Sequence, residues 1–512
     1  MTDTSHSSVT LRVTDSTTYV IGKLTKEIYQ EFKKTLGYKD PNFLWRNKTN
    51  NAWDGTVTTV CYSKAHCKCS VKKDGIHFPT GLYSRAVDFF RAYTVPISVS
   101  DERSSFSSNY INIETTSELQ FRDYQQDVIS KGIKAQRGIV KVATGGGKTA
   151  IGAGLIAGID VSPFIFYVTS QDLLRQAKSE LERFLLINGK PLEVGVIGGG
   201  KCDIKDINIM TVQTAVRALG EKYHKYDDEE DSEKETSQEM KEKYDTISNL
   251  IHSAKGMICD EVQHWAAETC QVIADHSDNA RFRYGLSATP WRDMGDDLLI
   301  DACFGKMIAE INASFLIRQK ILVKPTIYFV HTKKKLGDDV PYQTAYKDGI
   351  TNNEERNLMI ANVAQNMVKE GRHVLVSVKH VEHGLTLESL IPGSTFMQGS
   401  NTAKSRQKHI EKMRVKEAPI TIATSIFDEG IDVKPLDGLI LAGSGKSQTR
   451  ALQRIGRVIR TFEDPVTGFI KKDAYIVDFH DNMKYMLSHS RARRRIYETE
   501  PEFIIKDFKG TA

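Results

Sequence analysis

The stretch that decides the fold is Val142-Ala143-Thr144-Gly145-Gly146-Gly147-Lys148-Thr149. A β-like run at 139–143 leads into it, and an apolar helical stretch at 150–159 follows. Consecutive glycines let backbone N–H groups turn inward around an anion without Cβ clashes. The N-terminus of the following helix adds its positive dipole end. The strand–loop–helix context therefore predicts a phosphate-binding loop rather than a glycine-rich turn without a ligand.

Two residues at the end of this loop carry its chemistry. Lys148 is expected to reach the β- and γ-phosphates of ATP, and the Thr149 hydroxyl to ligate Mg²⁺. The general loop pattern begins with a glycine where this chain has Val142. The rest of the cradle is supplied by Thr144, Gly145, Gly146 and Gly147.

A second piece of the same site ends the apolar run Met257-Ile258-Cys259-Asp260-Glu261. Two carboxylates at a strand end are common on surfaces, but after a phosphate loop in the same lobe they become specific. Asp260 is expected to hold Mg²⁺, and Glu261 to orient and deprotonate the attacking water.

Short apolar runs alternate with amphipathic helical stretches along most of the chain, which predicts βα units around parallel sheets. The pattern occurs twice, so the predicted fold class is α/β with two tandem parallel-sheet lobes, at 119–318 and 319–512. The expected strands are 139–143, 164–168, 207–211, 256–259 and 284–286, then 326–330, 374–378, 420–423, 438–441 and 474–477.

The remaining segments frame these lobes. Residues 1–95 mix β-like runs with helical patterns, including a hairpin at 56–62 and a helix at 84–93, and predict a small α+β accessory domain. A polar stretch, 96–118, is expected to be a linker. A highly charged run, 221–245, interrupts the first lobe and is read as a solvated helix or a disordered insertion.

Composition sets broad limits on the class of protein. Lys and Arg exceed Asp and Glu by only five charges in 512 residues, which permits nucleic acid without arguing for it. No apolar run could span a bilayer and the first residues are polar, so a cytoplasmic location is expected. Seven cysteines do not indicate a disulfide framework. Cys61, Cys67 and Cys69 with His66 match no established zinc spacing, and small residues around a strand is the favoured interpretation.

The order of motifs resembles the superfamily 2 helicases over residues 119–482, whose phosphate loop also reads Thr-Gly-x-Gly-Lys-Thr. The resemblance implies two RecA-like lobes. Its motifs are Phe121-Arg122-Asp123-Tyr124-Gln125 for adenine, Thr169 with Leu173, Leu174 and Gln176 (Ia), Thr211-Val212-Gln213-Thr214 (Ic), Asp260-Glu261-Val262-Gln263-His264 (II), Ser287-Ala288-Thr289-Pro290 (III), Ala423-Thr424-Ser425 with Glu429-Gly430-Ile431-Asp432-Val433 (V), and Gln453-Arg454-Ile455-Gly456-Arg457-Val458-Ile459-Arg460 (VI).

The resemblance assigns roles to these positions. It implies ATP binding by Arg122, Gln125 and Gln453. Hydrolysis and strand movement would be coupled by Ser287, Ala288 and Thr289. The nucleic-acid backbone would be contacted by Thr169, Gln176, Thr211, Thr214 and Thr424.

Motif VI adds a physical argument for two lobes. Arg457 and Arg460 are spaced i, i+3, so they are expected on one helix face, pointing at the γ-phosphate held by the first lobe. Hydrolysis would then require closure of the cleft, which couples ATP to motion. Motif II departs from its usual form at Gln263, so either Gln263 or His264 is the residue that contacts motif VI.

The accessory domain resembles that of phage UvsW-like and T5-like branch-migrating helicases, on Asn51-Ala52-Trp53-Asp54-Gly55 and Phe78-Pro79-Thr80-Gly81-Leu82. Its cations and aromatics suit phosphate contact and base stacking, or equally a small core with a solvated face. They are Arg46, Lys48, Lys64, Lys68, Lys72, Lys73, Arg85 and Arg91, with Trp45, Trp53 and Tyr62. The basic segment 491–495 could also grip phosphates, or be a solvated end.

The expected function is an ATP-dependent DNA helicase or translocase that unwinds or branch-migrates forked and Holliday-junction-like DNA in replication, recombination or repair. No membrane and no obligate protein partner are expected, and the location would be the host cytoplasm if a phage encodes the chain. The alternatives are an ATP-dependent RNA helicase, a duplex-translocating motor subunit of a larger assembly, and a binding module built on a decayed ATPase. The presence of Lys148, Thr149, Glu261 and Arg457 argues against the last.

Overall fold

The structure is a computed structural model that forms two compact units, residues 1–142 with 147–310, and residues 143–146 with 311–512. It describes residues 8–508 apart from 41–42, 44–53, 67–68, 70, 106–110, 221–237, 292–294, 334–335, 338, 426–432, 444, 446 and 465. None of the described helices combines the length and the apolar character needed to cross a membrane. No disulfide bond is formed among the cysteines of the described ranges.

The first part of unit 1 is a small sheet with strand order β5-β2-β1-β6. Its core is aromatic, with Phe32, Phe78, Phe89 and Phe90 all buried. A separate pair of antiparallel strands stands beside it. The elements are β1 (Val9–Val13), β2 (Thr17–Ile21), α1 (Lys26–Thr35), β3 (Gly37–Lys39), β4 (Thr56–Thr58), η1 (Lys64–His66), β5 (His77–Pro79), η2 (Thr80–Leu82), α3 (Tyr83–Ala92) and β6 (Ile97–Asp101).

The stretch 96–118, expected to be a linker, contains two strands instead. β6 pairs in parallel with β1 and so completes the accessory sheet. β7 (Ile113–Thr115) pairs with β10 of the following lobe. β6 is largely exposed at a sheet edge, so it shows little alternation of apolar and polar residues. The polar composition of this stretch therefore gave no strand signal.

Lobe 1 is an eight-stranded sheet with order β13-β12-β14-β9-β15-β16-β8-β17. All five strands predicted for it are present. The pairings from β12 through β8 are parallel, as βα units require. The strands are β8 (Arg137–Val142), β9 (Phe164–Val168), β10 (Leu185–Ile187), β11 (Lys190–Pro191), β12 (Gly195–Gly198), β13 (Lys201–Asp203), β14 (Ile207–Thr211), β15 (Gly256–Asp260), β16 (Phe282–Ser287) and β17 (Met307–Ile311).

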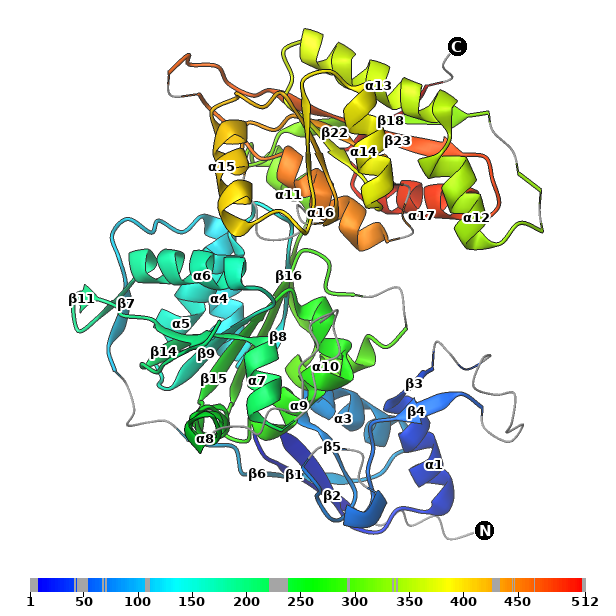
Figure 1. The fold of residues 1–512 in the computed structure, drawn as a ribbon. Helices are drawn as coiled ribbons and strands as arrows, with labels where there is room; N and C mark the ends of the chain where they lie inside the picture. The colour runs from blue at the N-terminus through cyan, green and yellow to red at the C-terminus, as the bar shows by residue number, and fades with distance from the viewer. Residues whose placement is uncertain are drawn as a thin grey trace. The chain divides into compact units, whose positions relative to one another are not determined.

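Helices cover both faces of the lobe 1 sheet (Figure 1). One layer holds α4 (Asp123–Ala135), α5 (Lys148–Ile159) and α6 (Gln171–Phe184). The other holds α7 (Val212–Ala218), α8 (Gln238–Ser253), η3 (Val262–Ala266), α9 (Glu268–His276) and α10 (Leu298–Phe304). α8 begins inside the predicted charged insertion, whose residues 221–237 lie outside the described ranges.

The accessory sheet docks on lobe 1 through a backbone contact that only glycine permits. A Cβ placed on Gly81 would lie 2.1 Å from the carbonyl oxygen of Asp301 in α10. Leu298 and Ala302 of the same helix join the accessory core. Arg137 of β8 donates to the carbonyl of Asp15 at 2.5 Å. The Phe-Pro-Thr-Gly-Leu segment is therefore a docking element between the two parts of unit 1.

Lobe 2 is a seven-stranded sheet with order β20-β21-β19-β22-β23-β18-β24, and the registered pairs are parallel. All five strands predicted for it are present. The strands are β18 (Lys324–Thr332), β19 (Val374–Ser377), β20 (Ser394–Met397), β21 (Ile420–Ala423), β22 (Gly438–Ile440), β23 (Asp473–Asp481) and β24 (Ile504–Phe508). The helices are α11 (Ala313–Arg318), α12 (Tyr342–Tyr346), η4 (Lys347–Thr351), α13 (Glu354–Lys369), α14 (Val381–Leu390), α15 (Ala403–Arg414), α16 (Gln448–Val458) and α17 (Met486–Glu498).

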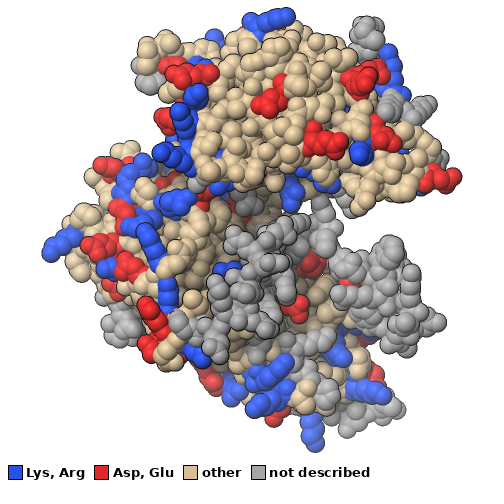
Figure 2. Space-filling model, viewed as in Figure 1, with Lys and Arg blue, Asp and Glu red and all other residues tan. Residues whose placement is uncertain are grey.

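The described surface mixes both signs of charge. On the face shown in Figure 2, Lys and Arg side chains gather along the flank of lobe 1 that α6 and β11 occupy in Figure 1, with Asp and Glu among them. A small net charge of +5 is what such mixing produces.

Candidate nucleotide and nucleic-acid sites

The glycine loop connects β8 to α5 as the sequence predicts. The Gly146 N–H donates to the Ala143 carbonyl at 2.9 Å, which closes a tight turn. Gly145 and Gly147 have φ angles of 89° and 82°, in the region that favours glycine. α5 starts directly after this turn, so Lys148 and Thr149 occupy its first two positions. The sequence order therefore places backbone donors and the helix N-terminus around one small space.

Gln125 lies beneath this loop. Its amide Nε2 is so close to Gly147 that a Cβ there would come within 2.5 Å of it. The Oε1 atom accepts the Arg122 N–H at 3.0 Å, at the start of α4. Gln125 is 3% exposed. The structure therefore brings together two segments that the sequence separates by a whole strand, and it fixes the amide that the resemblance assigns to adenine.

Lys148 projects from α5 onto the two acids at the end of β15. Its Nζ lies 2.8 Å from Glu261 Oε1 and 3.3 Å from Asp260 Oδ1. Burial by itself would lower the pKa of Lys148, but the two carboxylates raise it above its ordinary value. Burial raises the pKa of Asp260, with Lys148 opposing that effect. One ammonium thus faces two carboxylates, and the lysine remains charged.

Glu261 is held in an unusual backbone conformation. Its φ of 51° is left-handed, which is uncommon for a residue with a Cβ and is frequent at functional sites. Asp260 Oδ1 accepts the Glu261 N–H at 3.0 Å. The two carboxylates are therefore turned toward Lys148 by the backbone as well as by charge.

Motifs II and III are connected by one side chain. Gln263 donates to Glu261 Oε2 at 2.9 Å, and Ser287 donates to Gln263 Oε1 at 2.6 Å. Ser287 Oγ in turn accepts the Thr289 N–H at 3.0 Å, across Ala288. Gln263, the departure from the usual motif, therefore links the acid to the segment after β16 within lobe 1. Its contact with motif VI, or that of His264, stays a prediction.

The motif VI residues lie on α16 and just beyond it. Gln453 is nearly buried and Arg457 stands in the last helical turn. The helix ends at Val458, so Arg460 follows it and forms a β-bridge with Leu322. The expectation that both arginines share one helix face is therefore wrong for Arg460. Their approach to the phosphate loop stays a prediction, because motif VI and Lys148 belong to different compact units.

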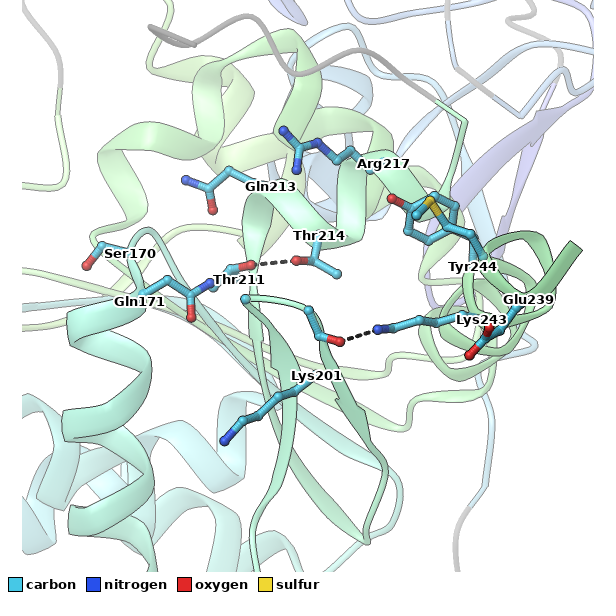
Figure 3. Close-up of a pocket in the computed structure, with 13 residues that line it drawn as sticks. Ser170, Gln171, Lys201, Thr211, Gln213, Thr214, Arg217, Glu239, Lys243 and Tyr244 are labelled. Atoms are coloured by element: carbon cyan, nitrogen blue, oxygen red, sulfur yellow. Dashed lines mark hydrogen bonds between the residues drawn. The ribbon is translucent and has the colours of Figure 1, made fainter. Parts of the chain in front are cut away.

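A pocket of about 620 Å³ opens where motifs Ia and Ic meet (Figure 3). Thr211 and Thr214 line it and share a hydrogen bond of 2.8 Å. Gln213, also in its wall, donates to the Thr169 carbonyl at 2.8 Å. The other lining residues are Ser170, Gln171, Gly199, Gly200, Lys201, Arg217, Glu239, Met240, Lys243 and Tyr244.

The pocket contains cations that the sequence interpretation missed. Lys201 follows a run of glycines, Arg217 lies on α7, and Lys243 donates to the Gly200 carbonyl from α8. The run Gly198-Gly199-Gly200-Lys201 was the available signal. The first turns of α8 belong to the predicted charged insertion, so this part of it lines a pocket and is not merely solvated.

The other predicted nucleic-acid contacts lie elsewhere. Gln176 faces solvent on α6 and donates to Glu180 at 2.9 Å. Thr424 follows β21 in lobe 2 and is 9% exposed. Within motif V, residues 429–432 lie outside the described ranges. Gln176 does not line the pocket of lobe 1, and Thr424 belongs to the other compact unit.

Some basic and aromatic residues predicted for the accessory domain have described contacts, and others lie outside the described ranges. Arg85 faces lobe 1, with Nη2 at 3.6 Å from Asp301 Oδ2, and Lys73 donates to Thr17 at 2.6 Å. Tyr62 is 51% exposed. Outside the described ranges are Trp45, Arg46, Lys48, Trp53 and Lys68. In the segment 491–495, Arg493 is buried against Asp478, so that residue does not grip phosphates.

Comparison with known families identifies the class of protein to which this chain belongs. Residues 118–292 match a family described as "Type III restriction enzyme, res subunit", and residues 393–462 match "Helicase conserved C-terminal domain". The DNA-bound "ATP-dependent Type ISP restriction-modification enzyme LlaBIII" has the same fold, with a TM-score of 0.52 at 13% identity over 76% of this chain and 32% of that one. Fold, site and family matches together show that this chain is a superfamily 2 helicase with two RecA-like lobes, an ATP-hydrolysing enzyme of nucleic acids.

Two phage relatives sharpen the resemblance. The chain is 24% identical to "ATP-dependent DNA helicase uvsW" of Enterobacteria phage T4, over 91% of both sequences. It is 31% identical to "Probable helicase D10" of Escherichia phage T5, over 43% of this chain and 49% of that protein. The resemblance to UvsW-like and T5-like helicases is therefore confirmed.

Proposed function

We propose that this enzyme is a Mg·ATP-dependent DNA helicase that unwinds or branch-migrates forked and Holliday-junction-like DNA. The observation that carries the proposal is the continuous path Lys148–Glu261–Gln263–Ser287, which joins a nucleotide-type cluster to motif III inside one lobe. The similarity to a phage DNA helicase supports the choice of substrate, because it spans the accessory domain as well as both lobes.

The residues present fit ATP with Mg²⁺. The loop 144–147 offers backbone N–H groups, and Lys148 can exchange carboxylate partners for phosphate oxygens. Thr149 and Asp260 supply the hard oxygen ligands that Mg²⁺ prefers. When bound, the metal ion would neutralise charge on the phosphates. Arg122, Gln125 and Gln453 would hold the nucleotide, and Arg457 and Arg460 would stabilise charge in the transition state.

Glu261 is the proposed general base. Its side chain is 15% exposed, so water reaches it. Displacement of Lys148 toward a phosphate would release its carboxylate to accept a proton from the attacking water. Because Gln263 bonds the same carboxylate, any shift of Glu261 is passed to Ser287, then through Ala288 to Thr289.

The pocket of lobe 1 is the proposed DNA-backbone site. Hydroxyls and amides from two motifs converge there with Lys201, Arg217 and Lys243, a mixture that suits phosphate oxygens. Thr169 supports the pocket through Gln213. Gln176 of lobe 1 and Thr424 of lobe 2 are further proposed contacts with the nucleic-acid backbone.

A substrate panel tests the proposal. Labelled forks, four-way junctions, plain duplexes and RNA–DNA or RNA duplexes are incubated with ATP and Mg²⁺, alongside ATPase stimulation by DNA and by RNA. We expect ATP-dependent turnover of forks and junctions and stimulation by DNA. Preferential unwinding of RNA would replace DNA with RNA as the substrate and would overturn the proposal.

The pocket is tested by a double variant. Lys201→Ala with Arg217→Ala should weaken single-stranded DNA binding by roughly tenfold or more and flatten its salt dependence, because two phosphate contacts are lost. Lys190→Ala, an exposed lysine on β11 outside the pocket, is the matched control. Equal binding by the double variant and the control would remove DNA from this pocket.

Translocation on duplex without strand separation is a second candidate. The family matched by residues 118–292 favours it. Displacement of a third strand from a triplex, without unwinding of forks, would support this candidate over the first.

A further inference from the structure

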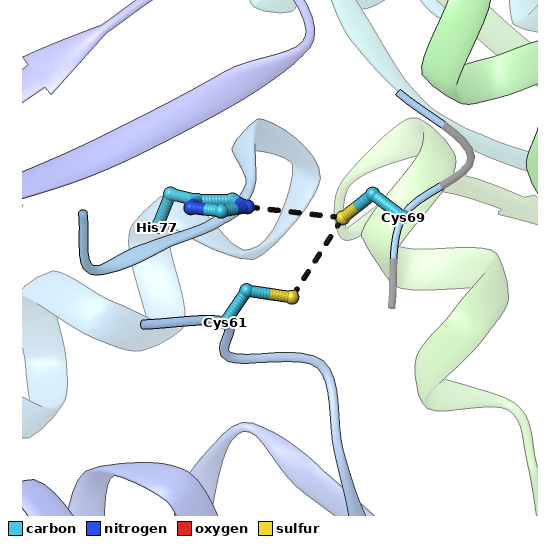
Figure 4. Close-up of side chains that lie close together, drawn as sticks. All are labelled: Cys61, Cys69 and His77. Atoms are coloured by element: carbon cyan, nitrogen blue, oxygen red, sulfur yellow. Dashed lines mark hydrogen bonds between the residues drawn. The ribbon is translucent and has the colours of Figure 1, made fainter. Parts of the chain in front are cut away.

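Three side chains of the accessory domain converge on one point although the sequence spaces them widely (Figure 4). Cys61 Sγ lies 3.8 Å from Cys69 Sγ, and Cys69 Sγ lies 3.9 Å from His77 Nε2. One ligand atom from each residue lies within 4.8 Å of both others. No disulfide joins the two cysteines, because the separation of their sulfurs far exceeds the roughly 2.05 Å of an S–S bond.

The backbone fixes two of the three. Cys61 and His77 form an isolated antiparallel bridge, with N–H to carbonyl bonds of 2.9 Å in both directions. Residues paired in this way project their side chains from the same face. Cys61 is 4% exposed and His77 1% exposed, and β5 anchors His77 to β2. Cys69 comes from the less buried segment that joins them.

The histidine is oriented as a ligand would be. Its Nδ1 lies 2.8 Å from the Gly75 carbonyl, which can only accept, so Nδ1 carries the proton. In the neutral ring, Nε2 then presents its lone pair toward Cys69. A carbonyl that fixes one nitrogen while the other faces the ligand cluster is the usual arrangement of metal-binding histidines.

The geometry and the donor set point to zinc, and we propose that Cys61, Cys69 and His77 bind one Zn²⁺ ion. Thiolate and imidazole ligands suit Zn²⁺, and a Zn–S bond of about 2.3 Å gives a tetrahedral edge of about 3.8 Å between two sulfurs. Cys69 Sγ and His77 Nε2 lie 3.9 Å apart, slightly farther than two ligands of one zinc ion, so binding is expected to draw these two side chains together. Water or a further side chain completes the coordination.

The zinc ion would clip the segment 62–76 onto the accessory sheet. That segment carries Lys64, Lys72 and Lys73, and its described bonds include Lys64 N–H to Asp74 at 3.2 Å. Because the site forms only in the folded chain, the free energy of zinc binding would stabilise this fold and hold these cations in a fixed array. The site is independent of the nucleotide cluster, so the proposal does not rest on the proposed function.

The first test uses the full-length wild type. Zinc is measured by mass spectrometry of the metal after gel filtration, and cysteine accessibility by differential alkylation before and after a chelator. We expect one zinc per chain, with Cys61 and Cys69 protected until the chelator is added, while Cys202 of lobe 1 reacts in both states. Alkylation of Cys61 and Cys69 at the same rate in both states, or a disulfide between them in place of zinc, would overturn the proposal.

Variants then locate the metal. Cys69→Ser changes the least buried ligand and should lose the zinc, as should His77→Gln, while Cys202→Ser keeps it. Co²⁺ in place of Zn²⁺ should give sulfur-to-metal absorption in the wild type and in Cys202→Ser, and this absorption should be lost in Cys69→Ser. Equal zinc in Cys69→Ser and Cys202→Ser would sink the inference.

Discussion

Each lobe contains a cluster in which a cationic side chain contacts carboxylates, and the two clusters differ in their role. In lobe 1, a single ammonium, Lys148, faces Asp260 and Glu261, and the three side chains are 15% to 18% exposed. In lobe 2, Arg493 bonds Asp478 through Nε at 2.8 Å and Nη2 at 2.7 Å, and the pair is 3% and 0% exposed.

The difference lies in balance and access. Arg493 also donates to the Gly445 carbonyl, and Asp478 accepts the Tyr497 hydroxyl, so the charges of this pair are matched and both side chains are closed off from solvent. In lobe 1, the two carboxylates of Asp260 and Glu261 face the one ammonium of Lys148, and solvent reaches all three side chains. A matched, closed pair is a structural element, whereas an unequal, open cluster can exchange partners with a ligand.

Breaking the open cluster should produce the largest change. Lys148→Ala is expected to lower ATP hydrolysis by roughly 10³-fold, because a charge that stabilises the transition state is lost, while DNA binding largely remains. Coupled-enzyme ATPase assays and DNA-binding titrations measure the two effects. Lys131→Ala, an exposed lysine paired with Asp127 on α4, is the control. Unwinding by Lys148→Ala at the wild-type rate would refute the site.

Breaking the closed pair should act on stability instead. Asp478→Asn leaves Arg493 buried without a counter-charge, so the free energy of unfolding should fall by about 3–5 kcal/mol. Glu498→Gln, which breaks the exposed pair with Arg494, should cost less than about 1 kcal/mol. Urea unfolding of lobe 2 measures both. Similar losses in the two variants would mean that burial does not separate the two kinds of pair.

Gln263 extends the open cluster toward motif III. Gln263→Ala should lower ATP turnover by roughly tenfold and lower strand separation per ATP further, because Glu261 loses an orienting donor and Ser287 its acceptor. Parallel ATPase and unwinding assays give the ratio. His264→Ala is the comparison variant. A larger loss in His264→Ala would transfer the coupling role to that residue.

Asp301 provides an intermediate case, because its partner Arg85 is half exposed. Burial raises the pKa of Asp301 from 3.8 to about 6, an effect that Arg85 only partly opposes. The folded state therefore holds the proton more tightly, so this contribution to stability is complete below pH 4 and is lost as pH rises through 6. Asp301→Asn should remove about 2 kcal/mol of this dependence. Unfolding free energies of both proteins from pH 4 to 7 test it, and parallel curves would contradict it.

Much of this structure could be predicted from signals between residues that are close together in the sequence. The phosphate loop, the acids after β15 and the ten predicted strands depend on residue types within a few positions of one another, which a sequence displays directly. Motif III was placed in the same way. The contacts between residues that are distant in the sequence could not be predicted in this way.

Contacts across the sheet could not be read from the chain. Gln125 lies under Gly147, and Gln263 turns to Ser287, only because separate strands bring them together. The sequence places His66 next to the cysteines, whereas in the structure a β-bridge brings His77 beside Cys61. In the sequence, Arg493 is one of several arginines that look exposed. In the structure, it is buried against Asp478 on the adjacent strand.

The close approach of Gly81 to α10 has a mechanical consequence. With no side chain between them, the two backbones leave no layer that could slide or be compressed, and Leu298 and Ala302 seal the joint. The accessory domain and lobe 1 are therefore expected to move as one body during ATP turnover. DNA bound by the accessory domain would then move together with lobe 1.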